Sequence, residues 1–250
     1  MTPESLSPAA SEAIPFSRVA ISPVEYLQEA WSRVKPQYGL FLGITAVGML
    51  LGSVAPLGIL LGPMFCGIYL CYRRQALGQP IAFDMLFKGF DYFGEAFIAS
   101  LLMVGAALVV MLPLMVALFI GMFATALGGA AGHGAETVAP FLSCALFGVF
   151  FLLVMLISAV ISVLFAFSFP LIMDRGVPGL EAVKLSFRAA RANLGGLLLL
   201  ALVNALLGFA GVLCCYVGAF LVLPVTIGTH WICYERVFGI KDQEVQTTQA

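Results

Sequence analysis

The segment FPLIMDRGVPGLEAVKLSFRAARANLGG, residues 169–196, joins two long apolar regions and carries four of the twelve Lys and Arg residues of the chain. Its second half has the pattern of an amphipathic helix. One stripe at helical spacing is apolar and consists of Leu180, Val183, Phe187 and Ala190. A second stripe at the same spacing is charged and consists of Glu181, Lys184, Arg188 and Arg191. A helix of this kind lies in a membrane interface with its apolar stripe toward the acyl chains.

The composition predicts an all-α protein that crosses a membrane several times. Hydrophobic residues make up 62% of the 250 residues, charged residues make up 10%, and the mean hydropathy is +1.06. An average soluble domain is about 25% charged. Uncharged runs cover residues 36–72, 96–135, 137–173 and 192–234, and each is longer than the roughly 20 residues that span the hydrocarbon core. The net charge of −1 and the lack of a basic soluble domain give no sign of a nucleic-acid partner.

These runs divide into six predicted spans within a single transmembrane domain, residues 23–238. The spans cover about residues 38–53, 57–74, 94–127, 138–173, 194–213 and 219–237. Turn-forming residues between Gly52 and Gly58 split the first run into a hairpin. Small residues spaced as GxxxG, at Gly48/Gly52 and Gly58/Gly62, favour close helix packing. We expect a disordered tail over residues 1–22 and a polar tail over residues 239–250.

The distribution of Lys and Arg predicts the orientation in the membrane. With six spans, all twelve lie on one face, which the positive-inside rule identifies as cytoplasmic. Both termini are then cytoplasmic, and the only charged residue on the opposite face is Glu136. Eight spans, with each long middle run folded into a hairpin, would keep the same segregation, but residues 156–162 contain no turn signal.

The chain also contains a loosely repeated unit. Aligning Gly39 with Gly195 pairs Lys35 with Arg191, and an acidic and aromatic segment of similar character precedes Gly94. We therefore predict three modules, each a cytoplasmic amphipathic helix followed by a transmembrane hairpin. The six cysteines lie in apolar runs without metal-ligand spacing, so we expect no disulfide.

A family resemblance follows from the order of these motifs. A helix containing Gly62-Pro63 is followed by the aromatic segment of residues 84–90, the FPLIMDRG break, the LEAVKLSFRAARAN helix and a C-terminal hairpin. This order resembles uncharacterised bacterial inner-membrane protein families of the YciC-like kind. It is also similar to the membrane domain of some glycerophosphodiester phosphodiesterases, whose catalytic domain has no counterpart here. The resemblance implies the fold and a bacterial inner-membrane location, and it implies no activity.

Two groups of side chains are candidate sites. The first is a set of possible lipid-headgroup contacts, consisting of Lys184, Arg188, Arg191 and Arg175. These residues either bind phospholipid or fix the topology of a helix packed on the cytoplasmic floor of the bundle. Asp174, beside Arg175, forms a local ion pair or caps the next helix.

The second group is polar and lies within or near the membrane. Asn204 either bonds a neighbouring helix or lines a solute path. Glu95 is either a helix-start carboxylate or a proton carrier. His230 is either a hydrogen-bonded structural residue or a group that titrates near neutral pH.

No catalytic, metal or cofactor site is expected, because His133 and Glu136 are too few for a metal and no nucleophile–base pattern is present. We therefore hypothesise a non-enzymatic protein that binds or organises membrane lipids. A permease for a small or apolar solute, with a cavity near Asn204 and Pro113, is the alternative. A role as an accessory subunit of a membrane complex is the second alternative. Homo-oligomers and protein partners are left open.

The predicted topology has a direct test. Reporter fusions at Gly132 and Lys184 should report opposite faces of the membrane, because the fourth predicted span, residues 138–173, lies between them. Alkaline phosphatase and fluorescent-protein activities of the two fusions measure this. The same face for both would contradict the six-span topology.

Overall fold

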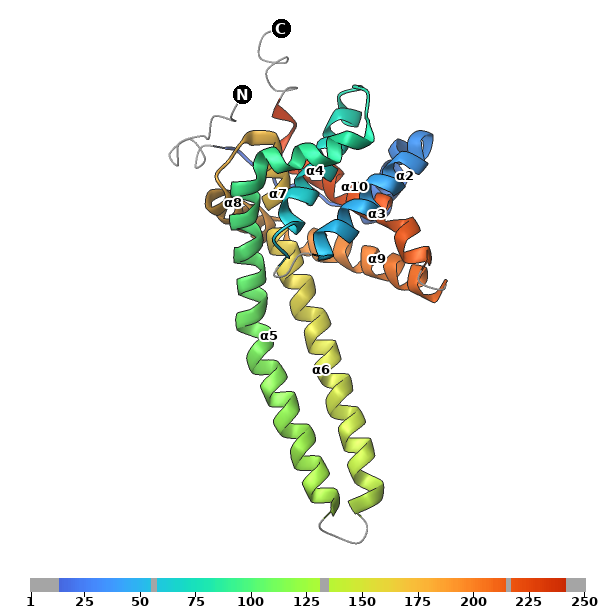
Figure 1. Cartoon of the computed structure of the whole chain (residues 1–250), viewed down its shortest axis with the longest axis vertical. Helices are drawn as coiled ribbons and strands as arrows, with labels where there is room; N and C mark the ends of the chain where they lie inside the picture. Colours follow the sequence, from blue (N-terminus) through green and yellow to red (C-terminus); the bar gives the residue numbers. More distant parts are fainter. Residues whose placement is uncertain (1–13, 55–57, 131–134, 215–216, 242–250) are drawn as a thin grey trace. The chain divides into compact units, whose positions relative to one another are not determined.

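The computed structural model describes residues 14–54, 58–130, 135–214 and 217–241, with residues 128–130 and 135–139 described by backbone alone (Figure 1). All regular elements in this part are helices, and it contains no strand. The first elements are α2 (Pro23–Val34), η1 (Lys35–Gln37), α3 (Tyr38–Val54), α4 (Leu61–Ala76) and η3 (Phe83–Tyr92). The following elements are α5 (Phe93–Ala130), α6 (Ala135–Phe165), α7 (Ser168–Arg175), α8 (Gly179–Ala192), α9 (Leu194–Leu213) and α10 (Val217–Phe238).

Five helical segments are long and apolar enough to cross a membrane. They are Pro23–Val54, Phe83–Leu127, Pro140–Arg175, Leu194–Leu213 and Val217–Phe238. The all-helical prediction is therefore confirmed, and the segments indicate a multi-pass membrane protein. The predicted span over residues 57–74 corresponds to α4, which has only 16 residues. At 1.5 Å per residue it is about 24 Å long, short of the roughly 30 Å hydrocarbon core.

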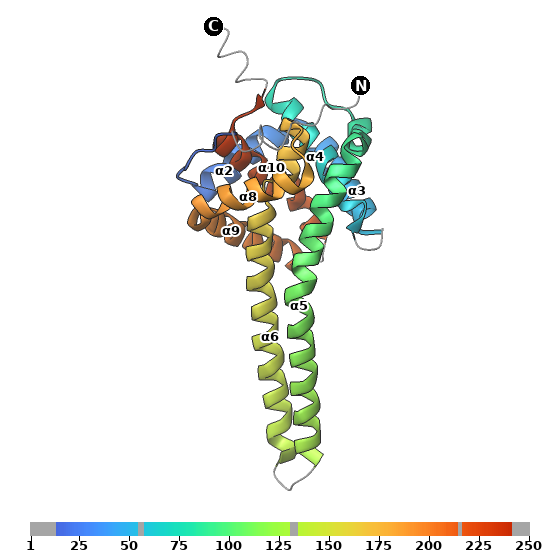
Figure 2. The ribbon, with the colours of Figure 1, turned by 90° about the vertical axis from the view of Figure 1, so that its left-hand side faces the viewer.

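The chain forms two compact units, residues 103–162 and the remainder. In the smaller unit, α5 and α6 run side by side in opposite directions (Figure 2), and Thr125 Oγ1 lies 2.9 Å from Ser143 Oγ across the pair. The less exposed positions of α5 recur at alternating intervals of four and three residues and are Ala107, Met111, Leu114, Leu118, Gly121 and Thr125. This spacing is typical of a two-helix seam. The other faces of both helices present large apolar side chains such as Phe119 and Phe147, as lipid-facing helices do.

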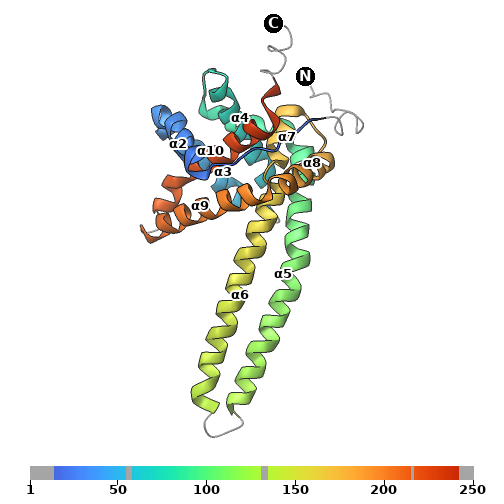
Figure 3. The ribbon, with the colours of Figure 1, turned by 180° about the vertical axis from the view of Figure 1, so that it is seen from behind.

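The larger unit is built around α4, which packs against α3, η3, α7 and α10. Cys66, Ile68 and Cys71 of α4 are fully buried. From α10, Trp231 and Tyr234 are the largest buried side chains of this core. Figure 3 shows α2 and α10 side by side, next to α9.

Glycines let α4 approach η3 at backbone distance. A Cβ atom on Gly67 would overlap the carbonyl of Leu86, and one on Gly89 would overlap the carbonyl of Pro63. The predicted close approach of small residues is also present at Gly48, where a Cβ would lie 2.9 Å from Ile68 Cδ1. Backbone contact of this kind is available only to residues without a side chain.

The described parts of the chain ends contact the helices. Within residues 14–22, part of the predicted N-terminal tail, the Ser17 amide donates to the Val237 carbonyl at 2.9 Å. The amide of Val19 also donates to Asn193 Oδ1 at 3.0 Å, and Asn193 Nδ2 donates back to the carbonyl of Ser17 at 3.3 Å. At the other end Ile240 is fully buried. Residues 1–13, 55–57, 131–134 and 242–250, which include predicted tail, turn and loop positions, lie outside the described part.

The glycine contact predicts a specific sensitivity. Gly67→Ala or Gly89→Ala should lower the free energy of unfolding by about 1–3 kcal/mol, because the added methyl group must push two backbones apart. Gly105→Ala is the matched control, since a Cβ there meets no atom within 4 Å. Thermal unfolding of the purified protein in detergent measures the difference. Equal stability of all three variants would contradict the close approach.

Candidate functional site

Asp174 is the centre of a buried ion cluster. Its carboxylate is fully buried and lies at the end of α7. Arg73 Nε of α4 lies 2.6 Å from Asp174 Oδ1, and the Tyr234 hydroxyl of α10 donates to Oδ2 at 2.8 Å. The backbone amide of Lys241 donates to the same oxygen at 3.4 Å. One carboxylate thus joins α4, α7 and the end of α10.

Arg175 belongs to the same cluster and is not the surface residue that we predicted. Its side chain is 9% exposed, and its Nε lies 3.6 Å from Asp174 Oδ2. One guanidinium nitrogen donates to the carbonyl of Phe238 at 2.6 Å. A buried charge needs such partners because leaving water is costly, and these partners of Arg175 are protein groups rather than solvent-facing ones.

A second ion cluster joins α2 to α10. Arg33 lies 2.7 Å from Glu235 and 2.5 Å from Glu29, and Arg236 lies 3.0 Å from Glu29. The side-chain amide of Gln75, at the end of α4, donates to the carbonyl of Arg33. The charged stripe of α2 is therefore directed largely at the protein.

The face of α8 that packs on the protein is not the apolar stripe, which was expected to face the acyl chains. The buried residues are Gly179, Ala182, Leu185, Ser186, Ala189 and Ala190. Leu180 is exposed, and Val183 and Phe187 are only half-buried, so Ala190 alone of the predicted stripe is buried. The physical reason is that small residues allow α8 to lie close to the protein. Ser186 Oγ adds bonds there, donating to the Leu164 carbonyl at 2.7 Å.

The outer face of α8 carries the remaining predicted headgroup residues. Lys184, Arg188 and Arg191 are all exposed. Lys184 Nζ lies 2.8 Å from Glu181 Oε1, and its side chain is 60% exposed. The Arg191 guanidinium carbon lies 4.2 Å from the centre of the Phe187 ring, a cation–π contact.

Glu95, in the first turn of α5, lies at the N-terminus of α8. Its Oε2 accepts a 2.6 Å hydrogen bond from the Gly179 amide, where the helix dipole favours a negative charge. Its carbonyl is so close to Gly179 that a Cβ would overlap it. Glu95 is therefore a helix-start carboxylate for α8, not only for α5, its own helix.

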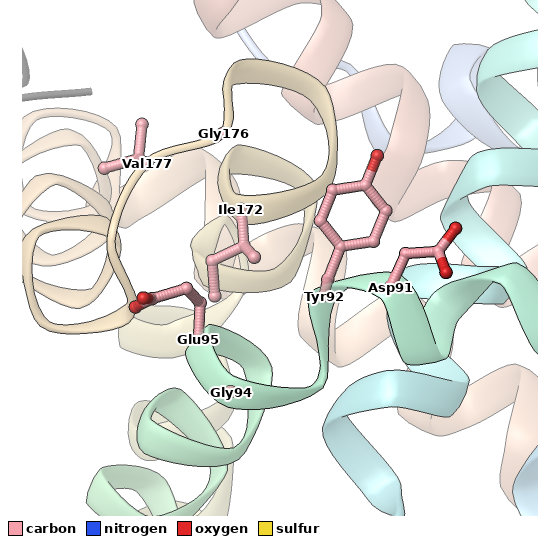
Figure 4. Close-up of a pocket in the computed structure, with 7 residues that line it drawn as sticks. All are labelled: Asp91, Tyr92, Gly94, Glu95, Ile172, Gly176 and Val177. Atoms are coloured by element: carbon pink, nitrogen blue, oxygen red, sulfur yellow. The ribbon is translucent and has the colours of Figure 1, made fainter. Parts of the chain in front are cut away.

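Glu95 also borders a pocket of about 270 Å³ near the start of α5 (Figure 4). The pocket is lined by Asp91, Tyr92, Gly94, Glu95, Ile172, Gly176 and Val177. Gly176 adopts a left-handed conformation with φ of 68° and ends α7. Figure 4 shows Tyr92 and Asp91 on one side of the pocket and Val177 on the other.

The two remaining polar candidates lie on α9 and α10. Asn204 Nδ2 donates to Thr229 Oγ1 at 2.9 Å, which is the bond to a neighbouring helix that we considered. Asn204 does not line the pocket beside Glu95. His230 is half-buried beside Trp231 and takes part in no side-chain hydrogen bond within the described residues. His133 and the side chain of Glu136 lie outside the described part. Within the described part, no three His, Cys, Asp or Glu side chains are grouped as metal ligands.

The Asp174 cluster predicts a large effect of one isosteric change. Asp174→Asn should lower the free energy of unfolding by about 3–5 kcal/mol, because it removes the buried negative charge that lies against Arg73 and Arg175. Asp91→Asn removes an exposed carboxylate and should change stability by no more than about 0.5 kcal/mol. Denaturant unfolding followed by tryptophan fluorescence measures both. A stable Asp174→Asn variant would show that the cluster is not needed.

Comparisons with protein-family models, curated proteins and solved structures find no match to this chain.

Proposed function

We propose that the chain is a multi-pass membrane protein that binds anionic phospholipid headgroups through the outer face of α8. The observation that supports this proposal is that the outer face of α8 has one apolar flank and one basic flank. Apolar Leu180, Val183 and Phe187 occupy one flank, and Lys184, Arg188 and Arg191 occupy the other. Because the opposite side of α8 is buried against the protein, the outer face is the part left for lipid.

The two flanks match the two layers of a membrane interface. Large apolar side chains on an interfacial helix insert beside the acyl chains, and basic residues stay at headgroup level. Each Lys or Arg near an anionic leaflet contributes about 1 kcal/mol. The Phe187 ring bridges the flanks, since Arg191 lies over it. The Lys184–Glu181 pair is exposed on the lysine side, so it contributes little and leaves Lys184 open to a phosphate.

For the topology, we propose an even number of crossings with both termini in the cytoplasm. The hydrogen bond between Ser17 and Val237 supports this, because it holds the two ends of the helical region together. The contact of Gln75 with Arg33 likewise holds the end of α4 beside the start of α3. Counting α4 as a short span gives six crossings, and local thinning of the bilayer can accommodate its length.

The location that we propose is a bacterial inner membrane. The support is the segregation of Lys and Arg in the sequence together with the resemblance to families of the YciC-like kind. The proposal assigns no reaction to the chain. A helix that only fixes the topology is the competing interpretation of α8, and the experiment below separates the two.

Removing the basic charges of α8 tests whether this helix binds anionic lipid. Changing Lys184, Arg188 and Arg191 together to Gln should weaken binding of phosphatidylglycerol by at least about tenfold, given about 1 kcal/mol for each basic residue. Native mass spectrometry of the protein in detergent with added lipid measures the binding.

The matched control removes the same charge elsewhere. Arg74, Lys88 and Lys241 changed together to Gln should leave phosphatidylglycerol binding close to that of the unmodified protein. Equal losses in both triple variants, or full binding in the α8 variant, would refute lipid recognition by α8. Inverted reporter fusions with unchanged lipid binding would identify α8 as a topology determinant instead.

A further inference from the structure

A groove of about 360 Å³ lies between α2, α9 and α10. It is lined by Leu27, Gln28, Trp31, Leu207, Leu221, Val222 and Val225. All but one of these side chains are apolar, and Val225 forms its buried floor. Its volume falls within the roughly 300–1,000 Å³ typical of ligand pockets.

The elements that form the groove determine what can reach it. Both α9 and α10 are long and apolar enough to cross a membrane, so the groove between them opens toward acyl chains rather than toward water. The third wall, α2, is amphipathic and turns its charged side toward α10 through Arg33 and Glu235. The groove therefore lies where the amphipathic α2 meets two long apolar helices.

Two aromatic residues border the groove. Trp31 is 45% exposed, and its ring contacts that of Tyr38 edge-on with centroids 5.7 Å apart. The Tyr38 hydroxyl donates to the carbonyl of Leu221 at 2.6 Å and so ties the start of α3 to the groove wall. Trp and Tyr in this arrangement are typical of the boundary between headgroups and acyl chains.

A cation without a counter-ion stands beside the apolar lining. Lys35 follows Trp31 by four residues on a continuous helical turn, which places it on the same helix face. It is exposed and forms no ion pair or side-chain hydrogen bond within the described residues. The neighbouring cations differ, because Arg33 and Arg236 pair with Glu29.

We infer that this groove holds one acyl chain of a membrane phospholipid whose phosphate lies against Lys35. The apolar wall takes the chain, the Trp31–Tyr38 pair lies at its upper boundary, and the lysine supplies the opposite charge. The site shares no residue with the outer face of α8. Loss of lipid binding at one of them therefore leaves the other unaffected, and the two proposals fail separately.

Filling the groove tests the inference. Leu207→Trp should reduce retention of one tightly bound phosphatidylglycerol by about tenfold, because the larger ring occupies the space of the chain. Leu206→Trp is the matched control, since Leu206 is the adjacent residue and is 60% exposed. Lys35→Gln should reduce retention about fivefold, the effect of about 1 kcal/mol. Native mass spectrometry of the whole protein in detergent counts the retained lipid.

A second measurement on the unmodified protein keeps the inference testable if Leu207→Trp fails to fold. Phosphatidylglycerol with a photoreactive acyl chain should crosslink to peptides that contain Trp31, Leu207 or Leu221. Equal retention in Leu207→Trp and Leu206→Trp, label confined to other peptides, or a crosslink between two copies of the chain at this groove would overturn the inference.

Discussion

The buried carboxylate of Asp174 is the constraint on which the rest of the larger unit depends. A carboxylate taken out of water must recover its lost hydration from nearby charges and donors. Here the partners come from α4, α10 and the segment that follows α10, through Arg73, Tyr234 and the amide of Lys241. If one of these helices slid past another, the Asp174 carboxylate would lose a partner while it remained buried. The cluster therefore contributes less to net stability than to selecting one register of three helices.

As a consequence, the polar ends of α4, α7 and α10 meet around Asp174. Arg73 ends an apolar run, Asp174 ends another, and Lys241 follows the last helix. The ion cluster of Glu29, Arg33 and Glu235 extends this layer to α2. Several of the Lys and Arg residues that are segregated in the sequence are thus joined through ion pairs, and the hydrogen bond from Gln75 to the Arg33 carbonyl links α4 to the second cluster.

The sequence predicts the features that depend on length and composition, and it misses those that depend on distant partners. Apolar length located the membrane helices, and helical periodicity located α2 and α8. The pairing of Arg73 with Asp174 joins residues 101 positions apart, so no local pattern can reveal it. The same holds for the meeting of Gly67 and Gly89, and for Asn193, whose side chain binds the segment around Ser17. The burial of Arg175 was missed because a charge next to a helix was assumed to face water.

The choice of the packed face of α8 has a general physical cause. In a soluble protein the apolar stripe of a helix is buried, because water surrounds the rest. In a membrane, lipid replaces water, so large apolar residues such as Leu180 gain nothing by turning inward. Small and polar residues such as Ala182 and Ser186 then occupy the protein side, where close approach and hydrogen bonds are available. It follows that the two proposed lipid sites recognise lipid differently. The outer face of α8 is open and charged, so its binding should depend on salt, whereas the groove beside α2 encloses apolar volume and should depend on the shape of the acyl chain.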